Sequence, residues 1–328
     1  MASPSPADIA AAATRIAPHA VHTPLIENQA LNDLVGGRVF LKLECLQRIG
    51  AFKFRGAMNG VAQIDRARHP GGVVACSSGN HAQGIAEAAR IAGMPATIVM
   101  PHDAPRAKVD GVHQAGGEIV GYDRAGEDRD AIARALARER AAAFLPPYDH
   151  AHIIAGQGTV GLEIIAQSEQ LGAAPDVVLV PCSGGGLISG VAIAVLDSRP
   201  GADVFAVEPE GFDDMARSLE SGRRVANRTN TGSICDALLS VTPGELTFEI
   251  CRDRLAGGLA VSDNAALEAM RFAFEHLKIV TEPSGVVALA ALLAGGVDAA
   301  GRVTVVVISG GNVDGPVFAR AIAGASGP

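Results

Sequence analysis

The 328-residue sequence predicts an α/β protein in which parallel strands are covered by helices on both faces. Short apolar runs rich in β-branched residues alternate with longer alanine-rich stretches of helical period. These short runs are apolar throughout, as expected of strands that are buried on both faces. The chain is also longer than a usual single core, which predicts two lobes with a cleft between them.

The first helix is expected to begin after Ser5, because Pro6 and Asp8 then occupy its first turn. Strand and helix candidates alternate from there on. Each expected strand is followed by an expected helix. The pairs, strand first, are 71–80 and 81–93, 96–101 and 104–116, 118–123 and 128–143, and 176–186 and 187–198. A last strand is expected at 302–312.

Composition excludes several classes of function. The net charge is -8 and no basic block occurs, so nucleic acid is not the expected partner. The five cysteines include no Cys-x-x-Cys pair, which favours buried reduced thiols over a zinc site or a disulfide framework. No signal peptide and no apolar run of about 18 residues is present, so we expect a soluble, cytoplasmic protein without a membrane partner.

Three predicted strands end in small residues: CSSGN at 76–80, CSGGG at 182–186 and SGGN at 309–312. Ligands of open α/β sheets bind at the carboxyl ends of strands, so three such loops predict one pocket. In SGGGLISG (183–190), Ser183 and the amides of Gly184, Gly185, Gly186 and Leu187 stand where a helix should begin, a place that binds phosphate.

The stretch GQGTVG at 156–161 fits the dinucleotide-binding pattern, but a poor strand candidate precedes it and no acid follows at the end of the next strand. We interpret it as a helix entry beside a pocket. Nicotinamide binding is therefore not expected.

Lys53 lies in GAFKFRGA (50–57), between two phenylalanines. An ordinary lysine, with a pKa of about 10.4, is protonated at neutral pH, whereas a confined one can lose its proton and form a Schiff base. The motif alone favours a lysine that extends its charge to solvent. Together with the phosphate-binding glycines, it suggests pyridoxal 5'-phosphate (PLP).

The chain resembles the fold type II PLP-dependent enzymes, in the branch of serine/threonine dehydratases and serine racemases. The resemblance runs from HTPL at 22 to SGGNVD at 309, through GAFKFRGA, SSGNHAQG, GQGT, PCSGGGL, AVEPEGFDD and TEPSGVVALAAL. It implies a two-domain tryptophan synthase β-like fold and a homodimer. Residues 1–52 and 148–328 would form the large PLP-binding domain, and 53–147 a small mobile domain.

The same resemblance assigns the cofactor-binding residues. Lys53 would be the catalytic Schiff-base lysine, with Phe52 beside the cofactor and Asn80 on its 3-oxygen. Ser309 would face the pyridine nitrogen. The phosphate would be bound by the loop of Ser183, Gly184, Gly185, Gly186 and Leu187.

For the substrate, the resemblance implies that donors in and directly after the first of these loops, CSSGN, bind the carboxylate, namely Ser77, Ser78, Asn80 and His81. Ser78 would also lie opposite Lys53 and exchange a proton on the other face, as in the racemases. Arg129 is either a surface arginine or a binding group for a second substrate carboxylate.

Glu208, the carbonyl of Phe212 and Asp214 match the divalent-cation site of the family, and an all-oxygen set suits Mg²⁺, Ca²⁺ or Mn²⁺. The competing interpretation is a solvated acidic turn. The implied reaction is β-elimination from a β-hydroxy amino acid such as L-threonine or L-serine, giving a 2-oxo acid and ammonia. The alternatives are a 3-hydroxyaspartate dehydratase and a serine racemase with lyase activity. Ala51, where the family usually has serine, leaves the substrate open.

Overall fold

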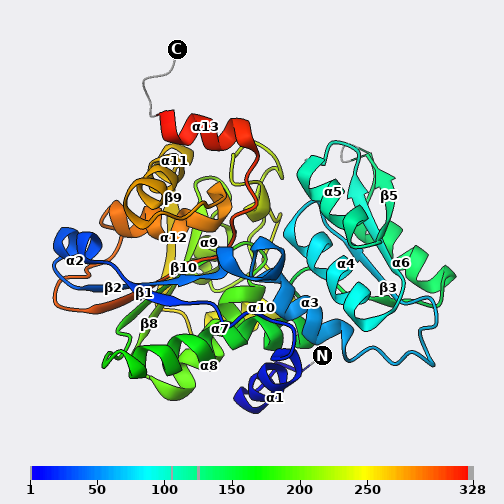
Figure 1. Cartoon of the computed structure of the whole chain (residues 1–328), viewed down its shortest axis with the longest axis horizontal. Coiled ribbons are helices and arrows are strands. Elements are labelled where there is room, and N and C mark those ends of the chain that lie inside the picture. The colour runs from blue at the N-terminus through cyan, green and yellow to red at the C-terminus, as the bar shows by residue number, and fades with distance from the viewer. Residues whose placement is uncertain (1, 105, 124–125, 324–328) are drawn as a thin grey trace.

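Two sheets form the frame of the molecule. The computed structural model describes residues 2–104, 106–123 and 126–323. One sheet has six strands in the order β1-β2-β10-β7-β8-β9, and the other has four in the order β5-β4-β3-β6. Figure 1 shows the two sheets in neighbouring halves of the molecule, with helix α3 between them. The prediction of an α/β fold is confirmed.

The six-stranded sheet is parallel except at one edge, where β1 pairs antiparallel with β2. The sequence did not predict this short edge strand. The members of the sheet are β1 (Leu25–Glu27), β2 (Arg38–Leu43), β7 (Val177–Pro181), β8 (Asp203–Pro209), β9 (Gly257–Val261) and β10 (Val303–Ile308).

Helices cover both faces of this sheet, as predicted, and each face has its own apolar core. One face packs against α2 (Gln29–Val35), α11 (Asp263–Phe272), α12 (Pro283–Leu293) and α13 (Gly315–Ala323). The other packs against α7 (Ala151–Gln170), α8 (Gly186–Ser198), α9 (Asp214–Ser221) and α10 (Glu245–Arg252). Alternation along β10 shows why: Val306 and Ile308 enter the first core, while Val305 and Val307 enter the second.

The four-stranded sheet is parallel and is also covered twice. Its strands are β3 (Val73–Cys76), β4 (Ala96–Pro101), β5 (Glu118–Tyr122) and β6 (Ala143–Phe144). One face packs against α3 (Lys53–Val61), α4 (Asn80–Ala92) and α5 (Arg106–Gln114), and the other against α6 (Arg129–Glu139). The division into a large domain and a mobile small domain stays a prediction.

The first helix, α1 (Pro6–Ile16), begins where the sequence indicated. Ser5 and Asp8 form a reciprocal capping box, in which each side chain accepts a hydrogen bond from the backbone of the other. Among the described helices, none is both long and apolar enough to span a bilayer. All five cysteines are buried and unpaired.

The glycines of GQGTVG serve helix packing. The predicted helix entry beside a pocket is wrong, because the motif lies inside α7 and does not line the main cavity. A Cβ atom on Gly156 would stand 2.6 Å from the Cα atom of Gly56 on α3, and one on Gly190 of α8 would stand 2.5 Å from the nitrogen of Gly158. Glycine at these positions lets α3 and α8 approach α7 closely.

Candidate active site

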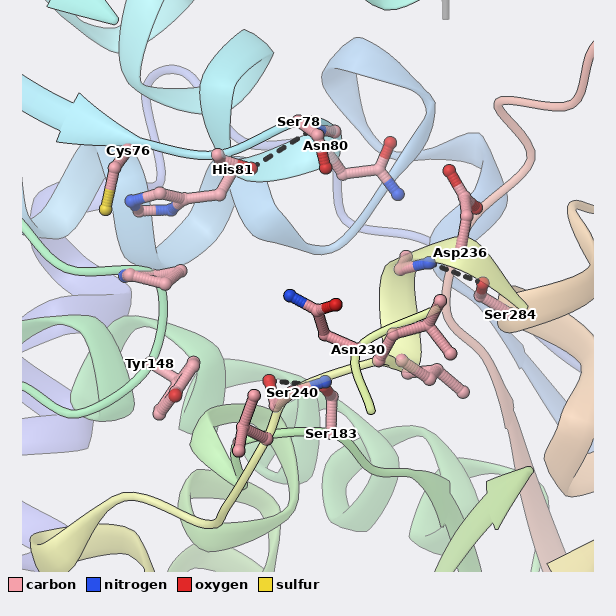
Figure 2. A pocket seen from close by; sticks show the side chains of 18 of the residues that line it. Cys76, Ser78, Asn80, His81, Tyr148, Ser183, Asn230, Asp236, Ser240 and Ser284 are labelled. Atoms are coloured by element: carbon pink, nitrogen blue, oxygen red, sulfur yellow. Dashed lines mark hydrogen bonds between the residues drawn. The ribbon is translucent and has the colours of Figure 1, made fainter. Parts of the chain in front are cut away.

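A cavity of about 620 Å³ lies where the two sheets meet, and all three predicted strand-end loops reach it. The loop after β3 supplies Ser77 to His81, the loop after β7 supplies Cys182 to Leu187, and β10 ends at Ser309. Figure 2 shows Ser78, Asn80 and His81 along one side of the cavity and Tyr148, Ser183 and Ser240 along the opposite side. The prediction of one shared pocket therefore agrees with the cavity.

Lys53 is the first residue of α3 and lies on the cavity wall beside Phe52. Its Nζ atom donates a hydrogen bond to the carbonyl of Pro147 at 2.8 Å and lies 5.3 Å from the ring centre of Phe52. Burial, and next the positive charge of Arg129, lower the pKa of Lys53 to about 8. The neutral, nucleophilic form of the amine is therefore reached at a lower pH than in an ordinary lysine.

Asn80 and His81 begin α4 at the cavity edge. The amide of Asn80 is buried and donates to Glu282. The Nε2 atom of His81 lies 3.2 Å from the carbonyl oxygen of Leu145, which can only accept, so Nε2 carries the proton. Burial lowers the pKa of His81 to about 3, so Nδ1 carries none. The ring of His81 therefore has no free donor, and its backbone amide is the donor that remains available to a substrate carboxylate.

The glycine loop after β7 is shaped by its neighbours. Gly185 caps α8 in the left-handed region, with φ of 95°, and a Cβ atom there would lie 2.8 Å from Thr247. A Cβ atom on Gly184 would lie 2.4 Å from three ring carbons of Tyr148. Because α8 begins at Gly186, its first amides have no partner within the helix and can bind an anion.

Sequence reasoning missed the partners of this loop. Tyr148 covers Gly184, and Ser240 exchanges hydrogen bonds with Ser183: the Ser183 hydroxyl donates to Ser240 Oγ at 2.7 Å and accepts from the Ser240 amide at 3.3 Å. Residues 230–233 and 236–242 line the same wall. This segment contains no strand and carries only a single 3₁₀ turn, η3 (Asp236–Leu238), so no periodic pattern marked it.

Arg129 is the first residue of α6 and lines the cavity. Within the described residues its one ion pair is a long one, 3.9 Å to Asp130. Its charge acts on both Lys53 and His81. Arg129 is thus a cavity cation, and the structure does not favour a plain surface arginine.

The three predicted metal ligands lie together outside the cavity. Glu208 is the next-to-last residue of β8, Phe212 lies in the following turn and Asp214 begins α9. The Glu208 carboxylate accepts the amides of Met215 and Ala216, at 3.0 and 2.9 Å. In the described part of the chain, no group of three or more His, Cys, Asp or Glu side chains is arranged to bind a metal. A cation here stays a proposal.

The model of the family described as "Pyridoxal-phosphate dependent enzyme" matches residues 16–310. This chain belongs to that family. It is 41% identical to an L-threo-3-hydroxyaspartate ammonia-lyase of Saccharomyces cerevisiae, over 99% of this chain and 98% of the other. A threonine deaminase from T.th. is 43% identical with a TM-score of 0.89, covering 95% of this chain and 99% of that one. Maize serine racemase is 37% identical with a TM-score of 0.91, covering 98% of each.

The predicted resemblance, its fold type and the PLP-dependent ammonia-lyase class are therefore confirmed. The residues of the cavity also fit PLP. Lys53 supplies an amine with a lowered pKa, and the helix N-terminus after Gly185 supplies amides for a phosphate. Glycine is needed at position 184, because a Cβ atom there would overlap the ring of Tyr148.

Replacing Gly184 with alanine is expected to weaken PLP binding roughly 10- to 100-fold, the cost of an overpacked methyl group. The new Cβ atom would overlap the Tyr148 ring, so Gly184→Ala combined with Tyr148→Ala should recover part of the affinity. Gly201→Ala is the control, because a Cβ atom there meets nothing within 4 Å. Titration of the cofactor-free protein with PLP, followed by absorbance, measures the affinity. Unchanged affinity in Gly184→Ala would place the phosphate elsewhere.

Proposed function

We propose that this enzyme deaminates a β-hydroxy amino acid of the L-threonine and L-serine type: water is eliminated first, and hydrolysis of the product then gives a 2-oxo acid and ammonia. The observation that supports it is the pairing of Lys53, with a pKa of about 8, with a glycine loop at a helix N-terminus on the wall of one cavity. PLP bound there would supply an electron sink for the negative charge that develops on the substrate α-carbon.

The other steps of the proposed reaction are assigned to residues of the cavity wall. Lys53 Nζ receives the proton from the α-carbon, after its hydrogen bond to Pro147 is released. Ser77, Ser78 and the start of α4 provide hydroxyls and amides for the substrate carboxylate. The β-hydroxyl leaves with a proton as water, and hydrolysis of the remaining C–N bond then yields the 2-oxo acid and ammonia. Ser309 would face the pyridine nitrogen of PLP, and Phe52 would lie beside the cofactor.

We propose 3-hydroxyaspartate as the second candidate substrate, because Arg129 on the cavity wall offers a guanidinium to a second carboxylate. The 41% identical relative of Saccharomyces cerevisiae carries the name of an ammonia-lyase for this substrate. L-Threonine and L-serine have no second carboxylate for Arg129 to bind.

The stereoisomers of serine, threonine and 3-hydroxyaspartate, assayed for 2-oxo acid and for change of enantiomer, test this choice. Arg129→Ala is expected to lower kcat/KM for 3-hydroxyaspartate by about 10- to 100-fold, the loss of a charged hydrogen-bond pair, and to change that for serine little. Arg138→Ala, exposed on the same helix, is the control. Equal losses for both substrates would contradict the role of Arg129. Enantiomer exchange without oxo acid would favour a racemase using Ser78.

We further propose that Glu208, Asp214 and the carbonyl of Phe212 hold a divalent cation that stabilises the turn between β8 and α9. The Oδ2 atom of Asp214 is buried and has no hydrogen-bond partner within the described chain. Burial raises the pKa of Asp214 to about 7 and that of Glu208 well above its ordinary value, and each carboxyl would be favoured as an anion by a cation.

Adding Mg²⁺, Ca²⁺ or Mn²⁺ to chelator-treated protein is expected to raise the melting temperature by several degrees. The cation binds the folded state only, which is the reason for the shift. Asp214→Asn should abolish it, while Asp213→Asn, which affects a neighbouring ion pair to Arg217, should not. Differential scanning calorimetry gives the comparison, and an equal shift in both variants would refute the site.

A further inference from the structure

Glu282 is a buried carboxylate in the cavity wall to which the motifs assigned no role. It caps the N-terminus of α12 and is 2% exposed. Its Oε1 atom accepts a hydrogen bond from Asn80 Nδ2 at 2.5 Å. Its Oε2 atom is buried and has no partner among the described residues. A buried acid with one oxygen unpaired, next to a predicted cofactor ligand, calls for a functional explanation.

The amide of Asn80 is fixed from both ends. Asn312 Nδ2 donates to the carbonyl of Ile49 at 2.8 Å and to Asn80 Oδ1, also at 2.8 Å. Because the carbonyl can only accept, the nitrogen of Asn312 is identified as the donor, and Asn80 Oδ1 as an acceptor. An ionised Glu282 likewise can only accept. The amide nitrogen of Asn80 therefore faces Glu282, and it has a second N–H that neither partner uses.

Two motif glycines make room for these contacts. A Cβ atom on Gly310 would lie 2.1 Å from Glu282 Oε1 and 3.3 Å from Asn80 Nδ2. A Cβ atom on Gly50, which has φ of 72°, would lie 2.5 Å from Asn312 Oδ1. The loop after β10 and the segment before Lys53 thus both accommodate the side chains that hold Asn80.

The charges around Glu282 come from several elements. Lys108 on α5 is paired with Asp236 of η3, and both act on Glu282. The thiols of Cys45 and Cys235 also lie near Glu282, and its negative charge contributes to the raised pKa of each thiol. Burial, opposed by Lys108 and assisted by Asp236, raises the pKa of Glu282 to about 7. Above this pH the carboxylate can only accept from Asn80 and carries a negative charge, and below it the protonated acid is neutral and can donate as well as accept.

We propose that Glu282 is a positioning residue that, together with Asn312, orients the Asn80 amide so that one N–H is kept for an oxygen of the bound cofactor. The inference rests on the proposed function, because it requires PLP in the cavity. It also gives the buried acid beside Asn80 a role that a neutral acceptor would fill only in part, because a neutral acceptor would orient the amide without responding to pH.

The test uses the visible absorbance of the PLP-loaded protein between pH 5.5 and 9 together with PLP affinity, both without substrate. Wild type should show a spectral transition near pH 7, the pKa of Glu282. Glu282→Gln should keep the affinity but lose the transition, because its amide oxygen still accepts from Asn80. Glu282→Ala should lose the transition, shift the band and weaken PLP binding roughly 2- to 10-fold. Glu268→Ala, exposed on α11, should match wild type.

Asn312→Ala acts on the other end of the same amide and should shift the band in the same direction as Glu282→Ala, which covers the case in which a Glu282 variant does not fold. A wild-type spectrum and pH response in folded Glu282→Ala and Asn312→Ala would overturn the inference while leaving the proposed function intact. A wild-type protein that takes up no PLP would overturn the proposed function itself.

Discussion

Lys53→Ala is expected to lower kcat for 2-oxo acid formation by at least about a thousandfold, because nucleophilic and acid–base roles are both lost. Borohydride should also no longer attach PLP covalently to the protein. The other lysine of the cavity wall, Lys108, is held in an ion pair with Asp236 and cannot substitute. Initial rates and mass spectrometry of the reduced protein give the two readouts.

Lys53→Arg and its control Lys278→Arg distinguish the positive charge of Lys53 from the reactivity of its amine. Arginine keeps a cation at position 53 but offers no amine of the required basicity, so Lys53→Arg should be as inactive as Lys53→Ala. Lys278 is exposed and donates to the carbonyl of Glu275, so Lys278→Arg should retain full activity. A Lys53→Arg enzyme within tenfold of wild type would remove Lys53 from the chemistry.

The pKa of Lys53 gives this prediction a pH signature. Burial and then Arg129 lower the pKa to about 8, whereas the unfolded chain keeps the ordinary value of 10.5. Between these values the unfolded state binds more protons, so the free energy of unfolding of cofactor-free protein should rise with pH across this window. Lys53→Ala should show a flatter rise over the same window, as measured by urea unfolding at successive pH values.

The strands and the phosphate loop were predictable because their signals are local. Val73 to Cys76 and Val303 to Ile308 are apolar at nearly every position, and the glycines at 184–186 follow such a strand directly. The resemblance then connected Lys53 to this loop across more than a hundred residues. Neither step required knowledge of which side chains meet in space.

The unpredicted features depend on contacts between distant segments. The ring of Tyr148 lies over Gly184, and the carboxylate of Glu282 accepts a hydrogen bond from Asn80. The sequence around Tyr148 and around Glu282 contains no pattern that predicts these contacts. The glycines of GQGTVG were misread for the same reason, since their packing partner is Gly56 on another helix. A pattern of glycines shows that space is needed without showing what fills it.

A buried cluster of charged side chains near Lys53 was also not predicted, because it too depends on contacts between distant segments. Two residues further along α3, Arg55 is 1% exposed and binds Glu44 through two hydrogen bonds of 2.8 Å. It also binds Glu163 of α7 at 2.6 and 2.8 Å, and Lys42 reaches the same carboxylate at 2.5 Å. In the sequence Arg55 is simply the charged residue after Phe54. In the fold its guanidinium joins α3 to α7 and to the end of β2.

Arg55→Met is expected to reduce the free energy of unfolding by about 3 to 5 kcal/mol, because it leaves the fully buried Glu44 without its cation. Arg55→Met combined with Glu44→Gln should recover part of this loss, since the stranded charge is then removed as well. Arg90→Met is the matched control: Arg90 also binds a carboxylate, Glu87, through two hydrogen bonds, but it is exposed, so its loss should cost far less stability than the loss of Arg55. Urea unfolding of the three variants gives the comparison.

The pH dependence of the Arg55 cluster distinguishes a lost ion pair from a packing defect. Burial raises the pKa of Glu163, but hydrogen bonds and charge from Arg55 outweigh burial and leave the pKa below the ordinary 4.5. Glu163 therefore stabilises the wild type above this value, and the contribution is lost as the pH falls through the lowered pKa. In Arg55→Met the acid-side loss should become smaller. If Arg55→Met is destabilised by the same amount at pH 4 and pH 7, its effect comes from packing, and the electrostatic account of how α3 holds Lys53 in place is wrong.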